Sequence, residues 1–358
     1  MVLHLPPPVH GAALVGKSVR ESRLVDERFA CRYINLSTSE TMGEVGAFSF
    51  RKIGKLFAIV RETLREVDRF QPELVYLTPA SSGLGFLKDQ LLVARLKRKG
   101  CRIVLHFHNK GVASHSGNRL YDRLYRRFFT GVKVILLSER LYPDIARYVD
   151  RKDVLICPNG AEAEPMTPVA HEGPCLLYLS NLIPSKGPLV LLDACQALKK
   201  RGVSFRCVFV GKETAEISAG RMREEIDSRA LEDVVRFDGP RYGAEKWKAL
   251  SQADVFVFPT FYHFECFPVV LLEAFAAGLP VVTTEEGAIP DIVTEGVNGL
   301  ICRREDPVSL ADALEKLLAD VSLRRTMGSA NREKYLADYT LQVFEQRFVS
   351  VLSTLLDA

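Results

Sequence analysis

The sequence predicts an α/β protein of two domains, each a parallel sheet wrapped by helices. Short β-branched runs alternate with segments of helical period along the whole chain, which is the pattern of such sheets. The 358 residues exceed what a single hydrophobic core usually serves. The stretch 161–174, AEAEPMTPVAHEGP, has no periodicity and separates two complete strand–helix series, so it is the predicted linker.

Eleven apolar runs are the expected strands. In chain order they are 31–37, 73–80, 101–108, 133–139, 153–160, 175–182, 205–211, 234–239, 254–260, 280–284 and 299–303. The run 3–10, LHLPPPVH, makes a poor strand. Near the end, Asp306 and Pro307 predict the N-cap and first turn of one helix, and apolar residues at helical spacing predict a final helix over 341–358.

Composition is that of a globular protein, with 47% apolar and 26% charged residues. The N-terminus lacks the basic start and apolar core of a signal peptide, and no run approaches 18 apolar residues. We therefore expect neither a leader nor a membrane span. The eight cysteines form no CxxC pair and several lie in apolar runs, which is typical of reduced, buried thiols in a cytoplasmic protein.

Charge is unevenly distributed between the two halves. Residues 1–165 hold 27 Lys and Arg against 17 Asp and Glu, a balance of +10, whereas the remainder holds 21 against 27, or −6. The imbalance predicts that the first half meets something anionic, such as phosphate groups, lipid head groups or nucleic acid. An uneven solvated surface explains it equally well.

The segment FPTFYHFECFPVVLLEAFAAGLPVVTT is the most informative one. A strand ends at Thr260, a polar and aromatic loop follows, and a helix is expected to start at Pro268. The free N–H groups of that helix favour an anionic phosphate at the carboxyl edge of the sheet. Glu265 precedes the helix and Glu273 lies roughly 7 to 8 Å inside it, a separation similar to that between sugar and ribose across a diphosphate. Carboxylates accept hydrogen bonds from vicinal hydroxyls.

With these residues the chain resembles the retaining glycosyltransferases of family 4, whose E-x7-E signature is matched by Glu265 and Glu273. Further similar pieces occur in the family's order: PNG at 158–160, LSNLIPSKGPLVLLDA at 179–194, VFVGKE at 208–213, RFDGP at 236–240, GLPVVTT at 278–284 and GAIPDIV at 287–293. The resemblance covers almost the whole chain. It implies the GT-B fold, two Rossmann-like, doubly wound domains facing across a cleft.

The resemblance also implies roles for the donor-site residues. Glu265 would contact the donor sugar hydroxyls, Glu273 the ribose hydroxyls, and Lys186 would neutralise the diphosphate as a point charge. Phe267 and Val269 are further expected donor contacts. The chain departs from the pattern where many relatives carry Arg, because Ser180 and Asn181 stand there, so phosphate neutralisation depends on Lys186 alone or borrows another base. Pro268 replaces a glycine often found at its position.

In the first half, 6–18 (PPPVHGAALVGKS) resembles the family's glycine-containing loop after the first strand. Gly11 and Gly16 are the expected positions of close approach to the donor. The alternatives are an ordinary turn and a P-loop, because Gly11, Gly16, Lys17 and Ser18 fit G-x4-G-K-[ST]. The P-loop is disfavoured by the poor strand before it and by the lack of a strand ending in Asp for Mg²⁺.

His108 ends an expected strand and matches the family histidine that faces sugar and acceptor. We assign it a catalytic role together with Lys186 and Glu265, since a neutral imidazole can bind a sugar hydroxyl. A structural histidine is the alternative. His106 is expected on the opposite strand face as scaffold. The expected acceptor-side residues are His10, Asn109 and Lys110.

Several absent motifs narrow the chemistry. The sequence has no D-x-D pair for Mg²⁺ or Mn²⁺, no H-E-x-x-H, no G-x-S-x-G and no complete G-x-G-x-x-G. We therefore expect no metal and no cofactor, the nucleotide sugar being a substrate, and no nucleic-acid partner.

The expected domains are 1–165, binding the acceptor, and 166–340, binding the nucleotide sugar, with 341–358 returning to the first. The expected activity is metal-independent transfer of a sugar, with retention, from a UDP-sugar or, second, GDP-mannose to a saccharide or lipid-linked acceptor. The expected setting is bacterial surface polysaccharide or glycolipid synthesis. An epimerase or phosphorylase of the same fold, or a non-catalytic nucleotide-sugar-binding protein, are the alternatives.

The segment 118–129, NRLYDRLYRRFF, predicts an amphipathic helix. Its arginines occupy one broad side and its apolar residues another, as in interfacial helices, and a basic cluster at 95–99 adds to the attraction. We expect docking on the anionic inner face of the cell membrane. An ordinary helix whose apolar side packs on the sheet is the alternative.

Overall fold

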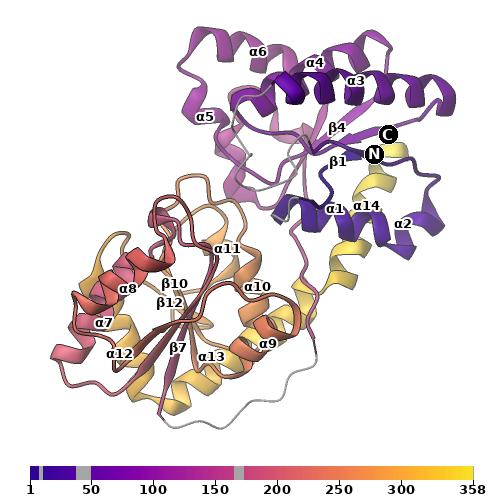
Figure 1. Cartoon of the computed structure of the whole chain (residues 1–358). Helices are drawn as coiled ribbons and strands as arrows, with labels where there is room; N and C mark the ends of the chain where they lie inside the picture. Colours follow the sequence, from indigo (N-terminus) through magenta and orange to yellow (C-terminus); the bar gives the residue numbers. More distant parts are fainter. Residues whose placement is uncertain (8–10, 38–49, 165–172, 358) are drawn as a thin grey trace. The chain divides into compact units, whose positions relative to one another are not determined.

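The computed structural model describes residues 1–7, 11–37, 50–164 and 173–357. The chain divides into two compact units, of which the first comprises Met1–Asn159 and Leu341–Ala358 and the second Gly160–Thr340 (Figure 1). The division after Asn159 falls before the boundary expected at residue 165. The last helix, α14 (Leu341–Asp357), packs within the first unit against α2 (Arg23–Arg28).

The first unit contains six parallel strands in the order β2-β1-β3-β4-β5-β6. They are β1 (Val2–Leu3), β2 (Ile34–Asn35), β3 (Val75–Leu77), β4 (Ile103–His106), β5 (Lys133–Leu136) and β6 (Val154–Ile156). Of the run 3–10, only Leu3 belongs to a strand among the residues described, as expected of a poor strand; the unexpected element is β1, which lies inside the sheet and pairs with both β2 and β3. Its two buried residues end before the prolines, so no proline N–H is needed in the ladder.

Helices cover both faces of this sheet (Figure 1). One side carries α3 (Phe50–Phe70), α4 (Gly83–Arg98) and α6 (Arg119–Phe129), and the other carries α1 (Gly11–Glu21), α2 and α14. The short α5 (Val112–His115) precedes α6. A buried apolar cluster joins the sheet to α1, α2 and α14; its members include Leu3, Val15, Val25, Tyr76, Ile135 and Phe348.

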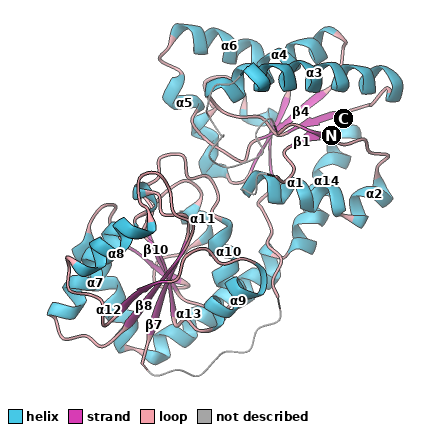
Figure 2. Ribbon diagram, in the orientation of Figure 1, coloured by secondary structure: helices cyan, strands magenta, loops and turns pink. Residues whose placement is uncertain are grey.

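The second unit also has a parallel sheet of six strands, in the order β12-β11-β10-β7-β8-β9. The strands are β7 (Cys175–Leu179), β8 (Arg206–Val210), β9 (Val235–Phe237), β10 (Val255–Phe258), β11 (Val281–Thr283) and β12 (Gly299–Ile301). Figure 2 shows helices on both sides of them. These are α7 (Pro188–Lys200), α8 (Ala219–Asp227), α9 (Gly243–Ser251), α10 (Val269–Ala276), α11 (Ile289–Ile292), α12 (Pro307–Ala319) and α13 (Val321–Lys334).

Each of the eleven expected strand runs contains a strand, so that part of the sequence analysis is confirmed. The helix after Asp306 is confirmed as well, since the Asp306 carboxylate accepts hydrogen bonds from the N–H groups of Val308 and Ser309. None of the helices in the described ranges is long and apolar enough to cross a bilayer.

The strand order of the second unit creates a switch point between β7 and β10. From β7 the chain continues outward through β8 and β9, then returns to β10 on the other side of β7 and continues to β12. The loops leaving β7 and β10 therefore diverge at the carboxyl edge of the sheet, where open α/β sheets bind ligands.

Candidate active site

Lys186 and Glu265 meet at this switch point. Lys186 ends the short turn that follows β7, and Glu265 lies in the loop after β10. The Lys186 Nζ and Glu265 Oε2 atoms are 2.7 Å apart, and the two side chains are only 17% and 8% exposed. The ammonium also lies 5.4 Å from the ring centre of Phe258 and 5.2 Å from that of Tyr262. The pair is thus a largely desolvated ion pair walled by aromatic rings.

Two glycines hold the backbone on either side of this pair. Gly187 has φ +83°, and a Cβ there would lie 2.2 Å from the carbonyl oxygen of Pro259, the residue that follows β10. Gly287 has φ +53°, and a Cβ there would lie 2.2 Å from the carbonyl oxygen of Glu265. Only glycine allows both the left-handed conformation and the close approach, so the positions of Lys186 and Glu265 are fixed by backbone packing.

Glu273 forms a second buried ion pair, with a lysine that the sequence analysis missed. The helix α10 begins at Val269, one residue later than expected, with Pro268 as its N-cap. Glu273 is 8% exposed, and its Oε1 atom lies 2.6 Å from Nζ of Lys246 on α9. Burial raises the pKa of the Glu273 carboxyl, and Lys246 opposes that shift. No local motif marks Lys246, because tertiary packing alone brings α9 to α10.

The two other expected donor contacts lie between the glutamates. The Phe267 side chain is buried, with its ring centre 6.1 Å from that of Tyr339, so the ring packs into the scaffold. Val269 opens α10 and is half-buried.

A pocket of about 400 Å³ follows β8 and β9 at the same edge of the sheet. Lys212, Glu213, Ala219, Arg223, Phe237, Asp238, Gly239, Pro240 and Tyr242 line it. The Leu182 N–H donates to the carbonyl oxygen of Lys212 at 2.9 Å, so the pocket adjoins the turn that holds Ser180 and Asn181. Lys212 is thereby close to the turn that holds Ser180 and Asn181, and Arg223 is a second basic residue lining the same pocket.

In the first unit, Asn109 and Lys110, which are expected on the acceptor side, follow β4. The Asn109 amide donates to the carbonyl oxygen of Pro79 at 3.0 Å, and the Ser81 hydroxyl donates to the carbonyl oxygen of Lys110 at 2.9 Å. These bonds join the loops that leave β3 and β4. His10 lies outside the described residues.

His106 does not point away from His108, so that expectation was wrong. The two ring centres are 4.1 Å apart, because residues two positions apart lie on the same side of an extended chain. The Tyr76 hydroxyl is 2.8 Å from His106 Nδ1, and the Phe348 ring of α14 stacks on His106 at 6.4 Å. Burial, and secondarily His108, lower the pKa of His106 well below its usual value, which keeps the imidazole neutral.

The glycine-containing loop expected over 6–18 is also corrected. Residues from Gly11 onward form the helix α1, which excludes both the loop and the P-loop geometry for Gly11–Ser18. Gly16 is buried in this helix, and a Cβ there would lie 2.0 Å from the carbonyl oxygen of His4. Its close approach is therefore to the segment after β1. A Cβ at Gly11 would meet nothing within 4 Å.

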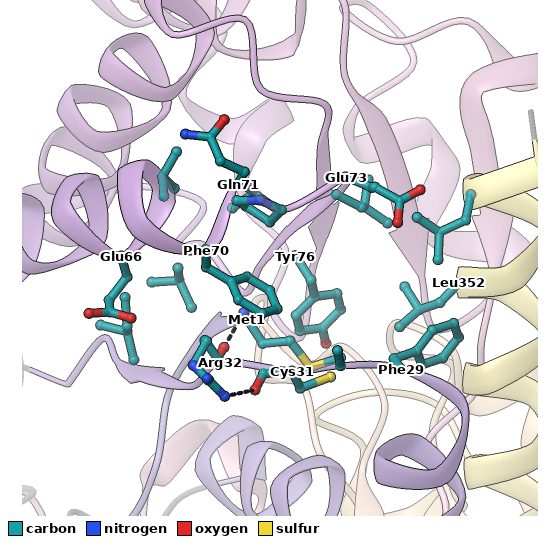
Figure 3. Close-up of a pocket in the computed structure, with 18 of the residues that line it drawn as sticks. Met1, Phe29, Cys31, Arg32, Glu66, Phe70, Gln71, Glu73, Tyr76 and Leu352 are labelled. Carbon is teal, nitrogen blue, oxygen red and sulfur yellow. Dashed lines mark hydrogen bonds between the residues drawn. The ribbon is translucent and has the colours of Figure 1, made fainter.

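A further cavity, of about 380 Å³, lies at the amino edge of the first sheet (Figure 3). Met1, Cys31 and Glu73, which line it, precede β1, β2 and β3, while Phe70 and Leu352 come from α3 and α14. None of the site residues expected from the sequence lines this cavity.

Residues 168–334 match the family model described as glycosyl transferases group 1. A similar curated protein is WcaL of Salmonella typhimurium, a glycosyltransferase named for colanic acid biosynthesis, at 32% identity over 50% of this chain and 45% of its own length. AmsK of Erwinia amylovora, an amylovoran biosynthesis glycosyltransferase, is 28% identical over 59% of this chain and 54% of its own. The chain thus spans about half the length of these relatives.

Solved structures share the fold. Sucrose-phosphate synthase from Thermosynechococcus elongatus superposes with a TM-score of 0.70 at 20% identity, over 91% of this chain and 83% of that one. HepE from Anabaena, in complex with UDP, gives 0.71 at 19% identity over 84% of each chain. These likenesses confirm the GT-B fold expected from the sequence, and in this chain each of its two parallel sheets has six strands.

Proposed function

Because residues 168–334 match the family model described as glycosyl transferases group 1, we propose that the chain transfers a sugar, with retention, from a nucleotide-diphosphate sugar to an acceptor hydroxyl. The observation that carries the proposal is the arrangement at the β7/β10 switch point, where Lys186 and Glu265 form a buried pair and Glu273 lies on the following helix. A cation paired with one carboxylate, with a second carboxylate on the next helix, suits a diphosphate that joins two hydroxyl-bearing sugars.

The donor occupies the second unit in this proposal. The Lys186 ammonium turns from Glu265 to the diphosphate, and the released Glu265 carboxylate accepts hydrogen bonds from hydroxyls of the transferred sugar. Glu273 accepts those of the ribose. The base enters the pocket beyond β8 and β9, where Phe237 and Tyr242 offer aromatic contact. Lys212 and Arg223 in that pocket supply positive charge that Ser180 and Asn181 cannot.

The chemical step exchanges one bond for another at the anomeric carbon. The bond from that carbon to the diphosphate oxygen breaks, and a bond to the acceptor oxygen forms on the same face. The acceptor proton passes to the departing diphosphate. Lys186 stabilises the negative charge that develops on the leaving oxygen, and this step requires no protein nucleophile.

UDP is the first-choice nucleotide and GDP the second. The HepE structures with UDP and with UDP-glucose support the choice, since they share this fold. The names of WcaL and AmsK support a role in bacterial surface polysaccharide or glycolipid synthesis. We assign the saccharide or lipid-linked acceptor to the first unit, at the loops that carry His108, Asn109 and Lys110.

Nucleotide binding by two alanine variants tests the proposal. Glu273→Ala should weaken UDP at least about tenfold in calorimetric titration, or 1.4 kcal/mol, because it removes a ribose contact. Glu265→Ala should bind UDP almost normally but lower turnover of the UDP-sugar, because it contacts the transferred sugar. Glu232→Ala, an exposed change in the same unit, is the control. Equal loss of UDP affinity in Glu265→Ala and Glu273→Ala would overturn the assignment.

We further propose that the first unit docks on an anionic membrane surface. The apolar side of α6 is mostly used inside the protein, since Tyr125, Phe128 and Phe129 are buried. The N–H of Gly83 donates to the Tyr121 hydroxyl, which brings the first turns of α4 and α6 together. At these turns Leu84 and Leu120 are 52% and 63% exposed.

The basic residues around these leucines divide into two groups. Arg126 pairs with Asp122, Lys99 with Asp68, and Lys97 donates to carbonyl oxygens at the end of α6. Arg119, Arg123 and Arg127 are exposed and form no ion pair with any described residue. These three, with the two leucines, make the surface that we propose meets lipid.

Vesicle sedimentation tests the membrane proposal. The protein should pellet with phosphatidylglycerol vesicles at low salt and be released at about 0.5 M NaCl, because screening then acts within a few Å. Changing Arg119, Arg123 and Arg127 to Ser should abolish pelleting, whereas the same change at the exposed Lys200, Lys316 and Arg325 of the second unit should not. Unchanged pelleting of the α6 variant would show that α6 is scaffold only.

A further inference from the structure

The second signature glutamate has a cationic partner as close as that of the first. Lys246 projects from α9 and its Nζ atom lies 2.6 Å from Glu273 Oε1, with side chains 24% and 11% exposed. The ammonium also lies 5.2 Å from the ring centre of its neighbour Trp247, which is itself 5% exposed. Lys246 is therefore held by two contacts, one ionic and one aromatic, beside a carboxyl group that is almost out of water.

Glu273 needs that cation if it is to stay ionised. A carboxylate in an apolar environment loses hydration and takes up a proton unless an opposite charge compensates. Its sequence neighbours Leu271, Leu272, Ala274 and Phe275 are all fully buried. Burial accordingly raises the pKa of Glu273, and Lys246 is the charged group that lowers it again.

The other elements packed on α10 do not replace Lys246. The helix α13 contributes Arg332, whose guanidinium donates to the carbonyl oxygen of Ala276 at the far end of α10, 2.6 Å away. The turn Tyr335–Tyr339 carries Asp338, which is acidic. Among the described residues, Lys246 is the charged group that lowers the pKa of Glu273 against the effect of burial.

The ionisation state decides what Glu273 can bind. A ribose presents two adjacent hydroxyl groups, each with one proton to donate. An ionised carboxylate has two acceptor oxygens and can take both protons in hydrogen bonds, whereas a protonated carboxyl uses one oxygen as a donor. Loss of the charge therefore weakens ribose binding without changing the shape of the site.

We propose that Lys246 is a positioning residue for the nucleotide, which holds Glu273 ionised and oriented toward the ribose hydroxyls. The inference rests on the proposed function of Glu273. Lys246 acts through that carboxylate and contributes to binding of the nucleotide before the chemical step. Its loss should therefore raise KM and leave kcat nearly unchanged.

The test is calorimetric titration of UDP between pH 6 and pH 8.5 with Lys246→Met, Lys246→Arg and Glu273→Gln. Lys246→Met should bind about tenfold more weakly at pH 7, and its affinity should rise with pH as Glu273 ionises. Lys246→Arg should remain within about threefold of wild type, because it restores the cation. Glu273→Gln, which mimics the protonated form, should bind weakly at every pH.

Two controls separate a positioning role from a structural one. Lys248→Met removes an exposed lysine from the same helix and should bind UDP as wild type does. Trp247 is the only tryptophan of the chain, so its fluorescence reports whether α9 stays in place in each variant. If Lys246→Met loses its native fluorescence, the proposal is tested with Lys246→Arg instead. UDP binding by Lys246→Arg that is close to wild type and independent of pH supports the proposal. Strongly weakened UDP binding by Lys246→Arg with native fluorescence overturns it.

The outcomes distinguish this inference from the function on which it rests. If Glu273→Gln binds UDP as tightly as wild type, the ribose assignment fails. If Glu273→Gln is weak but Lys246→Met binds normally and without pH dependence, the ribose assignment stands and the role of Lys246 is refuted.

Discussion

Replacing Lys186 by Met should destabilise the second unit even in the absence of a donor. The change leaves the Glu265 carboxylate, with 8% of its side chain exposed, without its partner. Breaking a buried ion pair from one side costs about 3–5 kcal/mol. Because Lys186 is 17% exposed and water reaches the edge of the pair, we expect the low end, about 3 kcal/mol.

The reverse change should cost less. In Glu265→Gln the ammonium of Lys186 keeps its contacts with the rings of Phe258 and Tyr262, and the amide still accepts a hydrogen bond. We expect about 1–2 kcal/mol. The double variant leaves no buried charge and should lose less than the two single losses together, with a coupling energy of about 2 kcal/mol.

Guanidinium unfolding followed by fluorescence measures these free energies in the right part of the molecule, because Trp247 lies in the second unit and is buried. Lys316→Met, an exposed change in the same unit, should stay within about 0.5 kcal/mol of wild type. Additive losses in the double-variant cycle, with coupling below about 0.5 kcal/mol, would refute the view that Lys186 and Glu265 neutralise each other in the empty site.

Three further predictions concern other parts of the chain. Sugar transfer should survive saturating EDTA, and activity that is lost and then restored by Mn²⁺ would contradict a metal-independent step. Gly16→Val should lower the thermal stability of the first unit, because its Cβ would lie 2.0 Å from the His4 carbonyl oxygen, whereas Gly11→Ala, with open space around it, should not. Burial lowers the pKa of His106, so at low pH the unfolded chain binds a proton that the native chain does not. The free energy of unfolding should therefore fall as the pH decreases below about 6.5, by up to about 1.4 kcal/mol per pH unit. An equal pH dependence in His106→Asn would contradict this.

Most of the fold could be predicted because buried parallel strands are continuous apolar runs. The run 254–260, for instance, contains β10 at Val255–Phe258. β1 was not predicted because a strand of two residues shows no periodicity. Its position in the sheet depends on its pairing with β2 and β3. The helix at Gly11 was mistaken for a loop because glycines suggested a turn, whereas Gly16 is small so that α1 can pack on the segment after β1.

The residues of the candidate site that could be predicted are those that lie in short, recognisable segments of the sequence. Glu265 and Glu273 belong to one strand–loop–helix segment, and Lys186 lies in a recognisable turn before a helix. Lys246 was missed because a lysine on an amphipathic helix is usually solvated, and only the packing of α9 beside α10 makes it a partner of Glu273. His106 was wrongly expected on the strand face opposite to His108. Residues two positions apart in a strand lie on the same face, so this rule would have placed the two histidines together.

The central claim is that the second unit binds a nucleoside diphosphate at the β7/β10 switch point. Thermal unfolding of the wild-type protein with UDP, GDP, ADP or dTDP tests it most directly. At about 100 times its dissociation constant, the matching nucleotide should stabilise the protein by about 2.7 kcal/mol and raise Tm by several degrees, with UDP first and GDP second. No shift of Tm with any of the four nucleotides would contradict the claim.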